Sequence, residues 1–136
     1  MSDPEKELRT RALGLLEPWF DCEEEAAVRR FDGSPFPAKL DVLARPRDPL
    51  LADLAIAIEI KSDPVIQPPR LASWIKQSAD YVGAIPISGW PRVVASFMWL
   101  VDAPLVDEPD KKVRMSGMIQ LAQYFRVGVA VLEGCL

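Results

Sequence analysis

The amino-acid sequence predicts an α/β fold in which a mixed central sheet is flanked by helices. Three strand-like segments follow a first helix, and the later strands alternate with helices, which gives the order α-β-β-β-α-β-α-β. The 136 residues are 49% hydrophobic and 26% charged, as in ordinary globular proteins. This length suits one domain, residues 1–136, around one modest core.

The first expected element is a helix near the N-terminus. Ser2 and Glu5 have the spacing of a capping box, and Pro4 suits an early helical position. The apolar residues that recur at helical spacing after them are Leu8, Ala12, Leu15, Leu16 and Trp19. Glu5 extends this stripe backwards, so we expect it on the same face of the helix.

Strands are then expected at 26–31, 38–44 and 54–61, with the turn signal DGSP after the first of them. The remaining expected elements are a helix at about 70–82, a strand at 92–101, a helix at about 111–125 and a short strand at 127–132. Early strands in a cluster and later strands separated by helices are typical of a mixed sheet with helices on both faces.

Composition excludes several kinds of chemistry. The sequence has no histidine, which excludes histidine triads, histidine zinc sites and histidine general bases. The two cysteines, Cys22 and Cys135, form neither a zinc quartet nor a disulfide framework. Glycine loops of the kinds that bind nucleotide phosphates are absent. Chemistry must therefore come from carboxylates, lysine, hydroxyls or a metal held by oxygen.

No apolar run approaches the roughly 18 residues that span a bilayer, and the acidic N-terminus has no hydrophobic region of the secretory type. We therefore expect a cytoplasmic protein without a membrane partner.

The net charge of −4 argues mildly against a nucleic-acid-binding protein, but the charge is unevenly distributed. Residues 1–25 hold eight acidic and three basic residues, so the rest of the chain is close to neutral. The acidic run at 23–25 is either a solvated face or a surface for a basic partner, including another copy of the chain. Five bases between 29 and 48 are either phosphate contacts or ordinary surface charge: Arg29, Arg30, Lys39, Arg45 and Arg47.

Charged residues inside two expected strands are the most informative feature. Successive strand side chains point to opposite faces. By this rule the two faces of the third strand carry Leu54, Ile56, Ile58 and Ile60 on one side and Ala55, Ala57, Glu59 and Lys61 on the other. In the second strand the same rule separates Leu40 and Val42 from Lys39 and Asp41. If the two strands are hairpin neighbours, Asp41 approaches Glu59 and Lys61 near one end of the sheet.

Two acids beside a lysine in a partly covered pocket are costly to desolvate unless something compensates. A divalent cation does so, because Mg²⁺ favours oxygen ligands and is often held by one or two carboxylates, waters and a substrate phosphate. Such a site suits attack of water on phosphorus, with the lysine orienting the water and offsetting negative charge. The alternative is a solvated cross-strand pair of Glu59 and Lys61, with Asp41 as a surface residue near a turn.

These residues together resemble the signature of the PD-(D/E)XK nuclease superfamily, which has the restriction-endonuclease-like fold. Asp41 lies on one strand and Glu-Ile-Lys at 59–61 on the next. Gln77 and Tyr81 resemble the Gln-x-x-x-Tyr helix of many members, and Glu5 is similar to the leading helical glutamate of the family.

The predicted αβββαβ core is also that of the family. The resemblance covers about residues 2–101, with 111–132 as an extra C-terminal helix and strand. Leu40, rather than proline, precedes Asp41, at a position that varies in the family.

The resemblance implies a role for each matching residue. Asp41 and Glu59 would hold Mg²⁺ or Mn²⁺ with the Ile60 backbone carbonyl, and Lys61 would position the attacking water and stabilise the transition state. Glu5 would aid metal or water binding. The residues expected to contact nucleic acid are Arg29, Arg30, Arg45, Arg47, Gln77 and Tyr81.

Two of these residues have alternative roles. Gln77 would either support Lys61 or touch the DNA backbone. Tyr81 is either a site residue or part of the core with a hydroxyl handle.

The function that the resemblance implies is that of a metal-dependent deoxyribonuclease hydrolysing DNA phosphodiester bonds. A chain of this size suits a structure- or end-directed enzyme of DNA repair, recombination or phage DNA metabolism. We also expect a homodimer, because one small domain grips little duplex. The alternative is a non-catalytic DNA-binding, protein-binding or assembly protein on the same fold. The low net charge favours this alternative, and the intact set of Asp41, Glu59, Lys61 and Gln77 opposes it.

Overall fold

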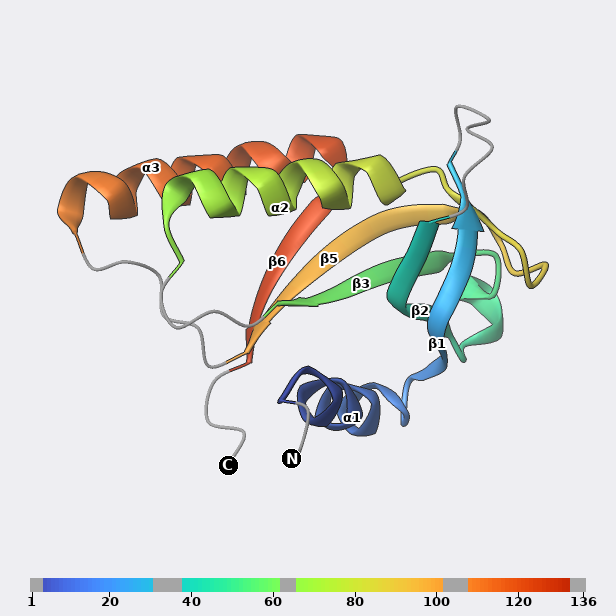
Figure 1. Ribbon diagram of the computed structural model, residues 1–136. Helices are drawn as coiled ribbons and strands as arrows, with labels where there is room; N and C mark the ends of the chain where they lie inside the picture. Colours follow the sequence, from blue (N-terminus) through green and yellow to red (C-terminus); the bar gives the residue numbers. More distant parts are fainter. Residues whose placement is uncertain (1–3, 31–37, 62–65, 102–107, 133–136) are drawn as a thin grey trace.

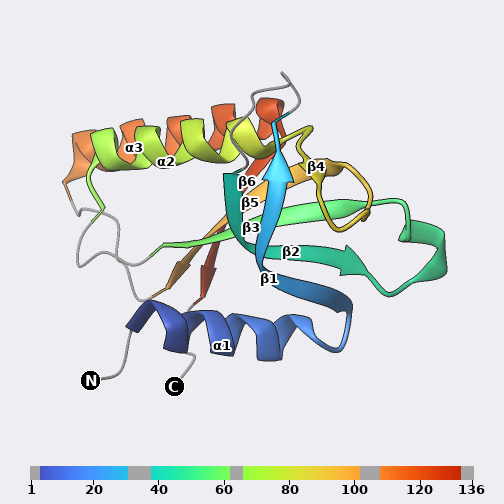
Figure 2. The same ribbon diagram turned by 45° about the vertical axis from the view of Figure 1, so that its right-hand side comes forward.

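A six-stranded sheet forms the centre of the protein. The computed structural model describes residues 4–30, 38–61, 66–101 and 108–132. Helix α1 (Pro4–Leu16) covers one face of the sheet, and helices α2 (Pro68–Tyr81) and α3 (Pro109–Ala122) lie side by side on the other (Figure 1, Figure 2). The expected α/β class, with helices on both faces of a mixed sheet, is confirmed. None of the described helices is long and apolar enough to cross a membrane.

The sheet combines an antiparallel and a parallel half. Its strands in chain order are β1 (Phe20–Arg29), β2 (Ala38–Pro46), β3 (Ala55–Lys61), β4 (Ile85–Pro86), β5 (Val93–Val101) and β6 (Val127–Leu132). Across the sheet they lie in the order β4-β1-β2-β3-β5-β6. The pairs from β4 to β3 are antiparallel, and the pairs β3–β5 and β5–β6 are parallel. Parallel neighbours need a crossover connection, which α2 and α3 supply.

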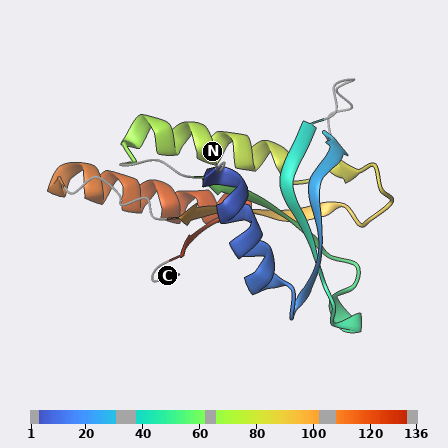
Figure 3. The ribbon, with the colours of Figure 1, turned by 60° about the horizontal axis from the view of Figure 1, so that its bottom comes forward.

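The alternation predicted for β3 is confirmed. Ile58 and Ile60 pack against Ala12 of α1, whereas Ala55 and Ala57 pack on the other face with Tyr81 of α2. Figure 3 shows α1 crossing its face of the sheet at an angle to the other two helices. Because the strand period is two, Glu59 and Lys61 lie on the α2 side of the sheet.

In β2 the predicted faces are wrong at one position. Leu40 and Val42 were expected to share a side, but Leu40 packs in the cluster of Tyr81 and Val42 in the cluster of α1. The strand is irregular between them, at Asp41. The residue across from Asp41 on β1 is Glu25, which has a left-handed φ of 49° and interrupts the pairing. An irregularity of this kind bends a strand and redirects its side chains.

The first strand also begins earlier than predicted, at Phe20 rather than at residue 26. Its acidic part, 23–25, therefore lies within β1. This part of β1 is paired on only one side by described strands, since the two-residue β4 reaches no further than Val28 and Arg29. An edge of this kind tolerates charge. Arg9 of α1 lies 3.4 Å and 3.6 Å from the carboxylates of Glu24 and Glu25.

Two short elements were not predicted from the sequence: β4, and the single-turn 3₁₀ helix η1 (Pro49–Leu51), which the Asp48 carboxylate caps by accepting from the Leu50 N–H. A second 3₁₀ turn, η2 (Gln123–Phe125), extends α3 towards β6 and occupies the end of the predicted helix. Elements of two or three residues are too short to show a hydrophobic period.

Candidate active site

Asp41 and Glu59 lie at the point where β2 and β3 cease to pair through their main chains. The ladder between these strands ends at Val42 opposite Ile58. Beyond it, side chains take over as acceptors: the Ile60 N–H donates to Asp41 Oδ2 at 2.9 Å, and the Asp41 N–H donates to Glu59 Oε1 at 3.2 Å. The two carboxyl groups thus satisfy main-chain donors that the ladder leaves open, and the sheet itself holds them next to each other.

Glu59 is only 5% exposed. Burial, and after it the negative charge of Asp41, raises the pKa of the Glu59 carboxyl to about 8; the hydrogen bond from the Asp41 main chain and the positive charge of Lys61 oppose the shift without cancelling it. At neutral pH the pair therefore retains a proton. A buried and a half-buried carboxyl group that cannot both ionise at little cost are an arrangement that a cation stabilises.

Lys61 brings a positive charge to the same place. Its Nζ donates to Gln77 Oε1 at 2.9 Å and lies 3.9 Å from Glu59 Oε2. The ammonium also lies 5.7 Å from the centre of the Trp74 ring, within the range of a cation–π contact. The Glu59 carboxyl group, the Gln77 amide and the Trp74 ring thus restrict the lysine side chain, which is otherwise flexible.

One face of α2 supplies the cover of the site. Trp74, Gln77 and Tyr81 follow each other at helical spacing, and Gln77 Nε2 donates to the Tyr81 hydroxyl at 3.4 Å. Tyr81 also packs with Ala55 and Ala57, and burial, together with the charge of Glu59, raises the pKa of its hydroxyl. The Tyr81 ring belongs to the core and its hydroxyl contacts Gln77, while a role of Tyr81 in the site stays a prediction. For Gln77 the structure shows the contact with Lys61.

The other predicted site residues are placed differently. Glu5 lies in the first turn of α1, and its side chain is outside the described residues. Arg29 and Arg30 are exposed at the end of β1. Arg30 is near enough to Tyr81 for its positive charge to be one of the smaller influences that lower the pKa of the hydroxyl.

Arg45 and Arg47 are not brought to the carboxyl pair. They lie four and six residues beyond Asp41 along β2, which corresponds to about 13 Å and 20 Å at 3.3 Å per residue. Arg45 Nε donates to the Ala52 carbonyl at 2.8 Å, and Arg47 Nε lies 3.3 Å from Asp21 Oδ1. Both arginine side chains thus make local contacts at the opposite end of the strand.

The oxygen donors of the site fit a hard divalent cation. Among the described residues there is no group of three or more acidic, cysteine or histidine side chains that could enclose a metal. Mg²⁺ does not require one, because it is commonly held by one or two carboxylates and keeps waters or substrate oxygens as its other ligands. Asp41, Glu59 and the Ile60 carbonyl are such donors, and the unfavourable burial of Glu59 beside Asp41 is what a cation would offset.

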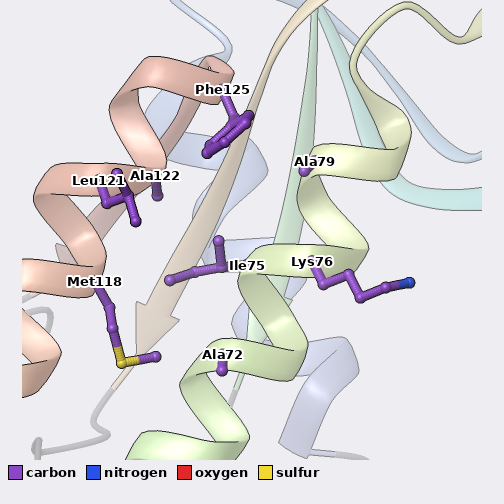
Figure 4. Close-up of a pocket in the computed structure, with 8 residues that line it drawn as sticks. All are labelled: Ala72, Ile75, Lys76, Ala79, Met118, Leu121, Ala122 and Phe125. Carbon is purple, nitrogen blue, oxygen red and sulfur yellow. The ribbon is translucent and has the colours of Figure 1, made fainter.

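A groove elsewhere on the molecule has a different character. It measures about 290 Å³ and lies between α2 and α3. Figure 4 shows Ile75, Met118 and Phe125 around it, while the ammonium of Lys76 points away. Its lining shares no residue with the carboxyl pair or with Lys61 and Gln77. The groove therefore gives no evidence for hydrolysis of a phosphodiester.

Comparison of the chain with protein-family models, with curated proteins and with solved structures gave no match. The geometry of the site is therefore the basis on which a function can be inferred.

Proposed function

We propose that the protein is a metal-dependent nuclease with a restriction-endonuclease-like fold, which hydrolyses DNA phosphodiester bonds. The observation that carries the proposal is the convergence of Asp41, Glu59 and Lys61 from two neighbouring strands, although Asp41 is remote from the other two in sequence. The element order supports it as well: a helix, three antiparallel strands, a helix and a parallel strand agree with the αβββαβ core of that fold.

In this proposal Asp41, Glu59 and the Ile60 carbonyl hold Mg²⁺ or Mn²⁺. When bound, the cation supplies a lowered pKa for water and neutralises charge on the phosphate. Lys61 orients the attacking water and offsets the negative charge that develops in the transition state. Gln77 keeps the ammonium in place through its 2.9 Å hydrogen bond and is thus a positioning residue.

The proposed substrate is DNA, approached from the side of the sheet that α2 covers. Arg29 and Arg30 are exposed at the end of β1, and we keep them as proposed backbone contacts. Arg45 and Arg47 are left out of the proposed interface because they are engaged at the far end of β2. A structure- or end-directed enzyme, acting as a homodimer in repair, recombination or phage DNA metabolism, remains our proposal for the biological setting.

A second candidate is a non-catalytic binding protein on the same fold. The raised pKa of Glu59 favours it, since a protonated carboxyl at neutral pH weakens a metal site. Cleavage assays separate the two functions. Linear, branched and single-stranded DNA are incubated with Mg²⁺, with Mn²⁺ and with a chelator, using the wild type, Asp41→Asn and the exposed control Asp53→Asn.

We expect metal-dependent cleavage by the wild type and by the control variant, and none by Asp41→Asn. Binding without cleavage in every metal would support the second candidate. Equal cleavage by Asp41→Asn and wild type would contradict the proposed site.

A further inference from the structure

The side of helix α3 that faces away from the sheet is exposed along its length. The buried residues Met115 and Ala122 mark the side that faces the sheet. On the opposite side four residues follow each other at spacings of four, three and four, and Leu121 lies next to them: Val113, Gly117, Gln120 and Tyr124. All five are exposed, and we call them the outer face of α3.

The composition of the outer face is unusual for a surface helix, which normally directs charged and polar side chains to solvent. Val113 is 74% exposed, Leu121 60% and Tyr124 86%. No charged residue occurs between positions 115 and 125, although 26% of the chain is charged. The centres of protein–protein interfaces are likewise depleted of charge and enriched in aromatic residues. The outer face therefore has the composition of a contact surface.

The outer face contains both a recess and a ridge. Gly117 forms the recess, since a Cβ there would meet nothing within 4 Å. A hollow of about 740 Å³ lies along the face and is lined by Gly117, Gln120, Leu121, Gln123 and Tyr124. Leu121 forms the ridge, because it also lines the apolar groove on the α2 side of α3 (Figure 4). A surface with both shapes can fit a copy of itself.

A two-fold axis makes this fit reciprocal. In a two-fold dimer, a contact of one residue with a second is repeated by the second with the first. Gly117 and Leu121 are equally far from position 119, and Val113 and Tyr124 are almost so. With two copies of α3 antiparallel about this position, Leu121 of each copy enters the recess at Gly117 of the other, and Tyr124 lies against Val113. This complementarity favours a second copy of the chain over an unrelated partner.

The exposed apolar area is close to what a specific dimer needs. A tyrosine or phenylalanine buries roughly 150–250 Å² in full, and a valine or leucine roughly 60–120 Å². At their exposed fractions, the side chains of Val113, Leu121, Tyr124 and the adjacent Phe125, which is 59% exposed, offer roughly 300–500 Å² per copy. A specific interface needs about 500 Å² per partner. The main chain at Gly117 and the glutamine amides add to this area, which suits a weak dimer that forms as concentration rises.

We propose that the outer face of α3 is a two-fold interface through which two copies of the chain associate. The interface gives a surface to the homodimer of the proposed function. It contains none of the residues of the candidate active site, so both sites of the dimer stay free. Association through this face does not depend on cleavage of DNA, and the two proposals can fail separately.

The test measures the mass of the protein by sedimentation velocity over a range of protein concentrations. Leu121→Glu places a charge on the ridge. Gly117→Gln fills the recess with a residue that favours the helix more than glycine does, so the single chain should fold at least as well. Leu50→Glu is the matched control, because Leu50 lies in η1 outside the outer face, is 91% exposed, and undergoes the same change as Leu121. Circular dichroism checks that all variants retain the fold.

We expect the mass of the wild type and of Leu50→Glu to rise with concentration towards twice the 15.1 kDa of one chain. Leu121→Glu should raise the dissociation constant of the dimer at least about 100-fold, because it puts an unpaired charge into an uncharged contact. Gly117→Gln should also remain monomeric.

A wild type that stays monomeric at every concentration would refute the proposal and leave the face to a different partner. A dimer that forms equally well in Leu121→Glu and Gly117→Gln would show that the copies meet elsewhere. Neither result bears on cleavage, which the Asp41→Asn assay tests independently.

Discussion

Asp41 and Glu59 bridge the gap between β2 and β3, where the Asp41 N–H donates to the Glu59 carboxylate at 3.2 Å. The Asp41 carboxylate in turn accepts from the main chain of Ile60 at 2.9 Å. Asp41 is therefore directed towards its partner and not into bulk solvent. A shared cation site requires this relationship, because two carboxylates on separate strands can bind one ion only if the sheet places them side by side.

Metal should stabilise the wild type through this pair. We expect a rise in melting temperature on titration with Mn²⁺, since a ligand at 100 times its Kd stabilises the folded state by about 2.7 kcal/mol. Asp41→Asn should abolish the rise and lower DNA cleavage at least about 100-fold. Substitution of residues that only hydrogen-bond to a metal ligand already lowers metal affinity or activity about 10- to 100-fold. Asp53→Asn is the control, and an undiminished Mn²⁺ effect in Asp41→Asn would show that the ion binds elsewhere.

Lys61→Met should separate catalysis from metal binding. The lysine is proposed to act on the water and on the developing charge, so its loss should lower kcat by about 100- to 1000-fold, as for other groups that stabilise a transition state. Mn²⁺ should still raise the melting temperature. Cleavage assays and melting curves on the same preparation test both statements, and cleavage at the wild-type rate would refute the role of Lys61.

Gln77→Leu should lower kcat about tenfold, because a hydrogen bond to a charged group contributes about 1.5 kcal/mol. The Mn²⁺-induced rise in melting temperature should be unchanged, since Gln77 contacts the lysine and not the carboxyl pair. Gln77→Glu keeps an acceptor oxygen and should restore activity. A variant that loses metal binding together with activity would indicate a structural role instead.

The raised pKa of Glu59 predicts how the stability of the metal-free protein depends on pH. The folded protein holds a proton with a pKa of about 8, whereas the ordinary value is 4.5, so folding takes up a proton between these values. The free energy of unfolding should therefore fall as pH rises from 5 to 8, by up to about 1.4 kcal/mol per pH unit. Denaturant unfolding of the wild type and of Glu59→Gln measures this, and the variant should lack this component.

Two glycines offer a matched test of the packing. A Cβ on Gly128 of β6 would clash with the Phe97 ring, whereas one on Gly117 of α3 would meet nothing within 4 Å. Gly128→Ala should destabilise the protein by about 1–3 kcal/mol through overpacking. Gly117→Ala should stabilise it by up to about 1 kcal/mol, because alanine favours the helix. Urea unfolding measures the free energy of unfolding of both variants. Equal changes for the two variants would contradict the placement of Phe97 over β6.

Much of the fold could be predicted because it depends on short-range periodicity. The order of the longer elements follows from periods of two and 3.6 in neighbouring residues. The same local rule placed Glu59 and Lys61 on one face of β3 and aligned Gln77 with Tyr81 on α2. Elements without a period were missed, such as β4, and the charged start of β1 was missed because an edge strand tolerates residues that a buried strand does not.

The sequence was thus sufficient for the residue types of the candidate site and for the side of each regular element on which they lie, since both depend on residues a few positions apart. Three-dimensional packing set the rest: the left-handed Glu25 opposite Asp41, the loss of the main-chain ladder beyond Val42, and the contact of Lys61 with the Trp74 ring. These features, like the burial that raises the pKa of Glu59, arise from groups distant along the chain. The pattern of residues within a single segment therefore cannot predict them.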